Sequence, residues 1–127
     1  MSDQRVPGHL GWLDLTVPDA PAIRDFYADV VGWTAEPQSM GDYEDFVMMA
    51  SDGDAIAGIC HRRGDNADLP AMWIPYVVVT DLTGSVARCR EGGGHVLGGI
   101  REMGGAGLYA FIRDPAGAVL ALFQHTG

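Results

Sequence analysis

The sequence predicts an α+β fold made of two tandem copies of one module, each with the order strand, helix, strand, strand, strand. In each half of the chain, segments with strand-like alternation flank one segment with helical spacing. The halves superpose at an offset of 62 residues, with Val17 on Val79, Asp19 on Asp81, Gly32 on Gly94 and Asp52 on Asp114. The 127 residues have the length of one domain. We therefore expect one domain over 1–127, in which neither module buries its sheet alone.

The first half begins with a strand that leads into a helix. Every second residue from Leu13 to Val17 is apolar, which is the period of a half-buried strand. Asp19 is a suitable N-cap, and Pro21 suits the first turn of a helix over 20–31. The apolar stripe expected on this helix consists of Ile23, Phe26, Tyr27 and Val30.

Three further strands complete the first half. They are expected at 33–40, where the pattern is weak, at 43–50 and at 55–61. The turn Ser51-Asp52-Gly53-Asp54 joins the last two as a hairpin. Module one thus covers about 9–62, and a polar connector over 63–72 follows it.

The second half repeats the same order. A strand over 73–80 precedes Asp81, a second N-cap, and a helix over 82–91 that three glycines end. The remaining strands are expected at 95–101, 108–113 and 118–124. Module two thus covers about 73–125.

The charge balance limits the partners. There are 17 acidic residues against 8 basic ones, all of them Arg, which gives a net charge of −9. Nucleic acids and anionic membranes need a basic surface, so we expect neither as a partner, and a cationic or neutral ligand suits this charge better than an anionic one.

Cys60 and Cys89 have no pattern of a disulfide scaffold, and no apolar segment resembles a signal or a membrane span. We expect free thiols and a cytoplasmic location.

Several short motifs carry a resemblance to a known family. They are Leu15-Thr16-Val17-Pro18-Asp19, Phe26-Tyr27, Val31-Gly32-Trp33, and Asp114-Pro115-Ala116-Gly117 with the strand from Ala118 to Phe123. Over residues 9–125 the chain resembles the vicinal oxygen chelate superfamily, the glyoxalase, bleomycin-resistance and extradiol-dioxygenase type. The resemblance implies that the strands curl into an incomplete barrel around a small-molecule cavity. It also implies a homodimer.

Catalytic members of that superfamily usually hold a divalent metal with His and Glu from the first and last strands of each module. The corresponding positions here are Trp12, Ile59 (or Gly58, if that hairpin is one residue shorter), Ile74 and Ala121. None of these side chains binds a metal ion. We therefore expect no metal at the usual site and no other cofactor.

Strand alternation predicts which side chains face the implied cavity. The expected ligand-binding residues are Trp12, Ile59, Ile74, Ala121 and Phe123. Three polar residues are catalytic candidates: Asp14 as a general base or ligand anchor, His61 for proton transfer, and Tyr76 as a donor to a ligand oxygen. The competing interpretations are an ion pair with Arg or a solvated position for Asp14, a surface position for His61, and a packing role for Tyr76.

These expectations favour a small-molecule-binding protein. It would sequester, or transform without a metal, a small apolar or aromatic compound. One alternative is a metal-dependent lyase, isomerase or dioxygenase of the same superfamily. The other is a non-catalytic interaction module whose cavity is filled by its own side chains. Whether the protein is an enzyme stays open at this point.

Overall fold

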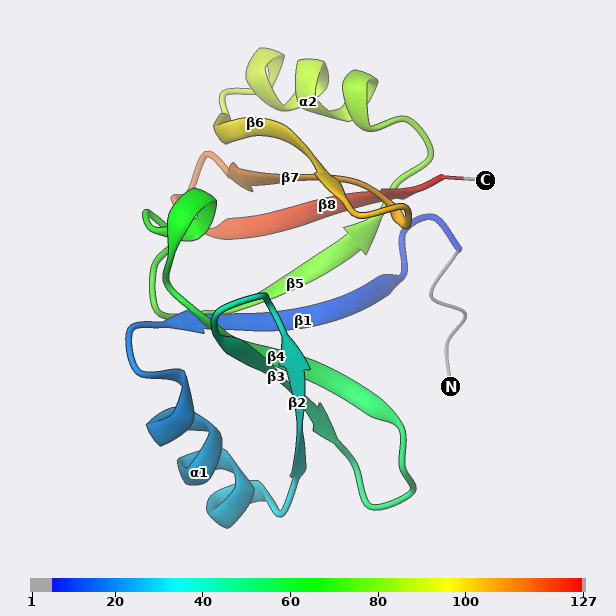
Figure 1. The fold of residues 1–127 in the computed structure, drawn as a ribbon. Coiled ribbons are helices and arrows are strands. Elements are labelled where there is room, and N and C mark those ends of the chain that lie inside the picture. The colour runs from blue at the N-terminus through cyan, green and yellow to red at the C-terminus, as the bar shows by residue number, and fades with distance from the viewer. Residues whose placement is uncertain (1–5, 127) are drawn as a thin grey trace. The chain divides into compact units, whose positions relative to one another are not determined.

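The chain forms two compact units, which we call the first and the second unit. The computed structural model describes residues 6–126, except the side chain of Asp65. The first unit is Leu13–Trp73, and the second is the rest of the described chain, including its start up to Trp12. Each unit contains one module's helix and most of its strands (Figure 1). The predicted α+β fold with two β-α-β-β-β modules is confirmed.

The first module contains one helix and four strands. They are β1 (Leu10–Val17), α1 (Ala20–Val31), β2 (Thr34–Ser39), β3 (Glu44–Met49) and β4 (Ala55–His61). The strand order is β2-β3-β4-β1, in which β1 and β4 are parallel and the other pairs antiparallel. A short 3₁₀ turn, Gly64–Asn66, lies in the connector that follows.

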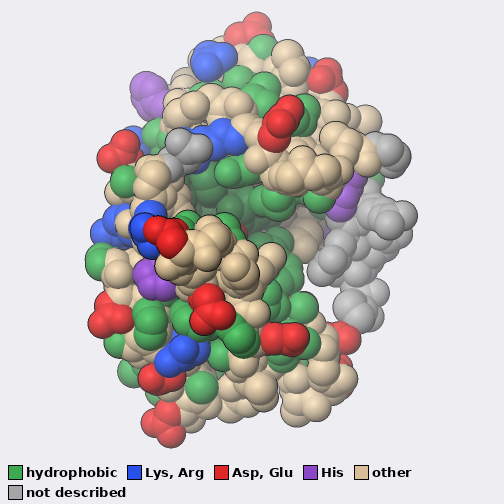
Figure 2. All heavy atoms as spheres, viewed as in Figure 1, with side chains coloured by type: hydrophobic (Ala, Val, Ile, Leu, Met, Phe, Trp, Pro, Cys, Tyr) green, Lys and Arg blue, Asp and Glu red, His purple; other side chains and the backbone are tan. Residues whose placement is uncertain are grey.

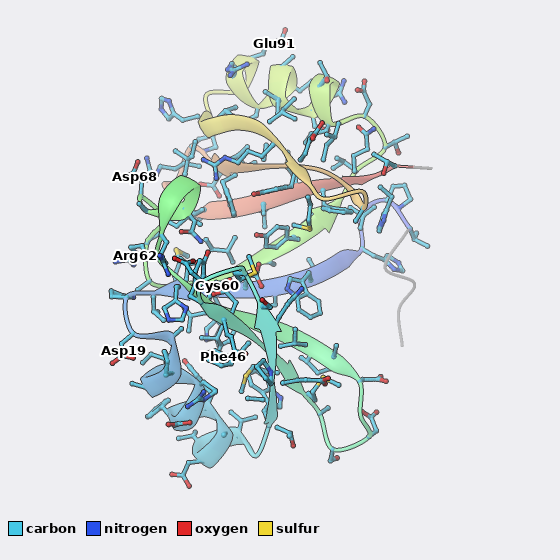
Figure 3. All side chains as sticks on the ribbon, viewed as in Figure 1. Asp19, Phe46, Cys60, Arg62, Asp68 and Glu91 are labelled. Carbon is cyan, nitrogen blue, oxygen red and sulfur yellow. The ribbon has the colours of Figure 1, made fainter. Side chains whose placement is uncertain are left out.

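Helix α1 has the predicted bounds because its caps are local. The side chain of Asp19 lies at the start of α1 (Figure 3), and its carboxylate accepts a hydrogen bond from the backbone N–H of Ala22 at 3.2 Å. Gly32 ends the helix in the left-handed conformation, with φ of +86°. The expected apolar stripe is half wrong, because Phe26 and Val30 are 54% and 61% exposed.

The core of the first unit lies between α1 and one face of the sheet. Its buried members are Leu15, Val17, Ala20, Phe46, Met48 and Ile59. Tyr27 of α1 packs at its margin together with Trp33 and Trp73. The indole N–H of Trp73 donates a hydrogen bond to the Tyr27 hydroxyl at 3.1 Å. This bond ties Trp73, which directly follows the connector, to the helix.

The second module repeats the arrangement. It contains β5 (Trp73–Val78), α2 (Leu82–Glu91), β6 (His95–Met103), β7 (Gly107–Arg113) and β8 (Val119–His125). The order is β5-β8-β7-β6, with β5 parallel to β8. The helix packs on one face of this sheet through Leu82, Val86, Ala110 and Leu122. The opposite face carries an aromatic cluster of Tyr76, Tyr109 and Phe111.

The described helices are too short or too polar to cross a membrane. On the face seen in Figure 2, acidic side chains are scattered over each module and do not gather in one patch. The negative net charge is therefore spread over this surface, as repulsion between like charges favours.

Candidate functional site

A cavity of about 120 Å³ lies in the second unit, on the sheet face opposite α2. Its lining residues are Gly11, Trp12, Tyr76, Met103, Phe123 and His125. Aromatic rings and a thioether dominate this lining, so the space is suited to a flat apolar group. An apolar cavity of roughly 150 Å³ can hold benzene, so the space here is close to that of one aromatic ring.

Register and alternation bring these residues together. Tyr76 of β5 pairs with Ala121 of β8, and Tyr109 of β7 pairs with Phe123. Side chains of paired residues lie on the same face, so the rings of Tyr76 and Phe123 lie on the face opposite Leu122, which packs with α2. Trp12 joins them because backbone hydrogen bonds link the segment just before β1 to Val78 of β5.

Three of the predicted site residues, Trp12, Tyr76 and Phe123, thus line one cavity. Ile74 and Ala121 lie in the same unit but are buried, with 2% and 0% exposed. The pairing of Ala121 with Tyr76 places its side chain on the same sheet face as the cavity. The binding roles of all five predicted residues stay predictions.

The expected orientation of Ile59 is wrong. It is fully buried in the core under α1, because β4 pairs in parallel with β1 and sets Ile59 beside Leu15. The hairpin before it is one residue shorter than in the second module, so Gly58 pairs with Asp14 as Ala121 pairs with Tyr76. A shift of one residue moves every side chain of a strand to the opposite face.

The same register separates the candidate catalytic residues. Asp14 shares its sheet face with Thr16 and Cys60, whereas His61 alternates to the other face, where its ring lies near that of Phe46. Cys60 lies on the face of Asp14 because it pairs with Thr16. Tyr76 belongs to the second unit. The three predicted catalytic residues are not gathered within one unit, and their roles stay predictions.

His61 has a partner that the sequence did not reveal. The buried Asp45 on β3 accepts a hydrogen bond from the His61 backbone N–H at 2.9 Å, and its Oδ1 lies 3.2 Å from His61 Nδ1. Tyr43 packs edge-on against the imidazole, and the Arg63 guanidinium lies 3.9 Å above the Tyr43 ring. This arrangement fixes the imidazole and holds the end of β4. Chemically, such a pair can orient a histidine for proton transfer.

Cys60 lies close to two carboxylates. Burial is the main cause that raises the pKa of its thiol well above the usual range, and the negative charges of Asp14 and Asp45 raise it further. The thiol is therefore neutral at physiological pH. A neutral, desolvated thiol is a poor nucleophile, so Cys60 is not suited to nucleophilic catalysis.

The residues at the family's usual metal positions do not fit a metal ion. The observed register identifies these positions as Trp12, Gly58, Ile74 and Ala121, and none supplies an imidazole, carboxylate or thiolate. Within residues 6–126, no group of three or more His, Cys, Asp or Glu side chains could hold a metal ion.

The sequence did not reveal three residues of the cavity wall, Gly11, Met103 and His125. His125 follows Phe123 by two residues on β8, so the same alternation would have included it if the strand had been extended. Met103 could not be found in this way, because β6 departs from regular pairing between Leu97 and Arg101. An irregular strand breaks the period on which such a prediction depends.

Comparison with known proteins identifies the class of protein that this fold defines. Residues 9–122 match the family model of the Glyoxalase/Bleomycin resistance protein/Dioxygenase superfamily. The chain belongs to this superfamily, and the resemblance noted in its motifs is confirmed.

Curated relatives include two kinds of protein. The chain is 30% identical to the anthracycline biosynthesis protein DnrV of Streptomyces peucetius, covering 93% of this chain and 47% of the relative. It is 32% identical to the putative glyoxylase CFP32 of Mycobacterium bovis, covering 92% of this chain and 46% of that protein. The chain therefore spans about half the length of the relatives it matches.

Solved structures share the fold at low sequence identity. Methylmalonyl-CoA epimerase from Mycobacterium tuberculosis aligns with a TM-score of 0.58 and 17% identity over 93% of this chain and 90% of that one. A superfamily member from Vibrio splendidus aligns with a TM-score of 0.60 and 14% identity over 89% of this chain and 96% of that one. These likenesses support the fold alone.

Proposed function

We propose that the protein binds a small planar aromatic compound and that the cavity of the second unit holds one of its rings. The observation that carries this proposal is the lining of that cavity, in which Trp12, Tyr76 and Phe123 surround a space of about 120 Å³. Aromatic side chains attract flat rings through offset and edge-to-face contacts. A larger ligand would extend beyond the cavity with its remaining rings.

The relatives support this choice of ligand class. Two of them, from Streptomyces peucetius and Streptomyces sp. strain C5, are described as anthracycline biosynthesis proteins. Anthracyclines are planar polycyclic aromatic compounds, and one edge ring of such a molecule has the size of the cavity. The proposal includes the homodimer that the resemblance implies, and binding that requires no metal.

Replacing Trp12 by Ala should weaken binding of 2-naphthylmethanol, a neutral two-ring probe, by about threefold to tenfold, because one ring–ring contact contributes about 0.5–1.5 kcal/mol. Isothermal titration calorimetry measures the dissociation constant. Phe26→Ala is the matched control, since Phe26 is an exposed aromatic residue on α1, outside the cavity. The Phe26→Ala variant should bind 2-naphthylmethanol as tightly as the wild type.

Thermal melts would verify that the Trp12 variant folds, and Phe123→Leu gives a second, milder change of the same wall. The proposal fails if the wild type binds no naphthyl probe. It also fails if the cavity variants bind as tightly as Phe26→Ala.

A further inference from the structure

Strand β6 contains a bulge beside the cavity. Leu97 pairs with Phe111 of β7 and Arg101 pairs with Tyr109, so the three residues 98–100 stand opposite one residue of β7. Gly98 and Gly99 have φ of +82° and +86°, in the left-handed region that residues with a side chain rarely adopt. The two glycines therefore permit the bulge.

The bulge makes room for one side chain. A Cβ atom at Gly98 would collide with Nη2 of Arg101, whereas a Cβ at Gly99 would meet no atom within 4 Å. The guanidinium of Arg101 is thus folded against the bare backbone of Gly98. The two neighbouring glycines share the same backbone constraint, but only Gly98 makes space for the Arg101 side chain.

The Arg101 guanidinium lies on the aromatic cluster and has an unsatisfied donor. Its central carbon is 5.6 Å from the centroid of the Phe111 ring. Its Nη1 atom is buried and has no hydrogen-bond partner in the described part of the chain. A buried charged donor without an acceptor is unfavourable, so a rotation of the Arg101 side chain that brings this donor to an acceptor from outside the chain would be favoured.

Arg101 lies on the same sheet face as the cavity. Arg101 and Met103 are two residues apart on β6 and so share one face, and Met103 lines the cavity. Tyr76, another cavity residue, contacts Phe111, with 5.8 Å between the ring centroids. The ring under the guanidinium and the Tyr76 ring of the cavity wall therefore belong to one aromatic cluster.

We propose that Arg101 binds an anionic oxygen of the ligand, so that the preferred compounds are aromatic acids, with a carboxylate or acidic phenol beside the bound ring. This inference rests on the proposed function and specifies its ligand class. It differs from what the net charge of −9 favours, which is a cationic or neutral ligand. A direct contact outweighs the field of distant surface charges, which salt screens within about 10 Å. Arg101 therefore determines ligand specificity.

The test compares 2-naphthoate with 2-naphthylmethanol by calorimetry. The wild type should prefer the carboxylate, and Arg101→Gln should weaken its binding by about tenfold or more, as the loss of a charged hydrogen bond does. Binding of the neutral alcohol should change by less than about twofold, because ring contacts alone hold it. Arg101→Lys should keep part of the preference for 2-naphthoate, since lysine has the positive charge but lacks the planar guanidinium group.

A pair of glycine variants tests the bulge itself. Gly98→Ala should reduce the preference for 2-naphthoate, because its methyl group displaces the guanidinium, whereas Gly99→Ala should retain it. Both variants place alanine at a positive φ and so share the backbone strain.

Equal affinities of wild type and Arg101→Gln for 2-naphthoate would overturn the role of Arg101, while alcohol binding would still support the proposed function. If the wild type binds neither probe, both proposals fail.

Discussion

Cys60 shows how a single residue can acquire its chemistry from neighbours that are distant in sequence. Its sheet face brings it near Asp14 of β1, and strand pairing brings it near Asp45 of β3. Burial and the two negative charges all favour the protonated thiol, so they raise its pKa in the folded state. Sequence alone does not place these carboxylates beside Cys60, because the register of β4 against β1 and β3 decides which face its side chain occupies.

Replacing Cys60 by Ala should therefore reduce the loss of stability at alkaline pH. The folded thiol keeps its proton, whereas the unfolded thiol releases it above its ordinary pKa of 9.0. The contribution of Cys60 to the free energy of unfolding is thus complete below about pH 9 and falls as pH rises, by up to about 1.4 kcal/mol per pH unit. Urea unfolding at pH 8, 9 and 10 measures this slope.

Cys89→Ala is the matched control, because it removes a cysteine and leaves Cys60 in place. The free energy of unfolding of Cys89→Ala should fall with pH as steeply as that of the wild type between pH 8 and pH 10. If the two variants lose stability equally between pH 8 and pH 10, the raised pKa of Cys60 has no thermodynamic effect.

At the scale of elements, both helices begin at an aspartate whose side chain caps the first turn. Asp19 accepts from the Ala22 N–H at 3.2 Å and Asp81 from the Gly84 N–H at 3.1 Å. Because a cap involves residues only three apart, sequence alone placed the bounds of α1 and α2 correctly.

The face that a strand residue occupies is harder to predict than a helix bound, since pairing with a distant strand sets the register. Ile59 therefore turned toward the core under α1, although its strand was predicted correctly.

Asp19→Ala should lower the free energy of unfolding by about 1 kcal/mol, the usual effect of losing an N-cap. The N–H groups of the first turn would lose their acceptor, and α1 would fray at its start. Asp29→Ala removes the same charge from an exposed position of α1 and should leave stability within about 0.5 kcal/mol of the wild type. Urea unfolding at pH 7 compares them. A similar loss in both variants would mean that net charge, and not capping, causes the effect.

At the scale of the whole molecule, the chain has the superfamily fold without that superfamily's usual metal ligands. An aromatic residue, a glycine and two aliphatic residues stand at the four positions; the motifs gave Ile59 or Gly58 for one of them, and the register selects Gly58. Ligand affinity should therefore depend on ring contacts and on Arg101, neither of which needs a metal ion.

We accordingly expect that dialysis against EDTA leaves the affinity for 2-naphthylmethanol unchanged within about twofold, because no lining residue would lose a metal contact. Calorimetry before and after dialysis measures this, and elemental analysis of protein purified without added metal provides the control. A stoichiometric metal ion whose removal abolishes binding would show that ligands outside the usual positions hold it.

The sequence by itself determined the two modules, the helix bounds, the strand order along the chain and the non-ligating residues at the usual metal positions. Each of these follows from local periodicity, caps, turns or motifs, which involve residues close together in the chain. Only the tertiary structure decided that Met103 and His125 join the predicted cavity residues, that Asp14 and His61 occupy opposite faces, and that Arg101 lies over Phe111. These relations depend on strand register and on one bulge, and both are set by pairing between distant segments.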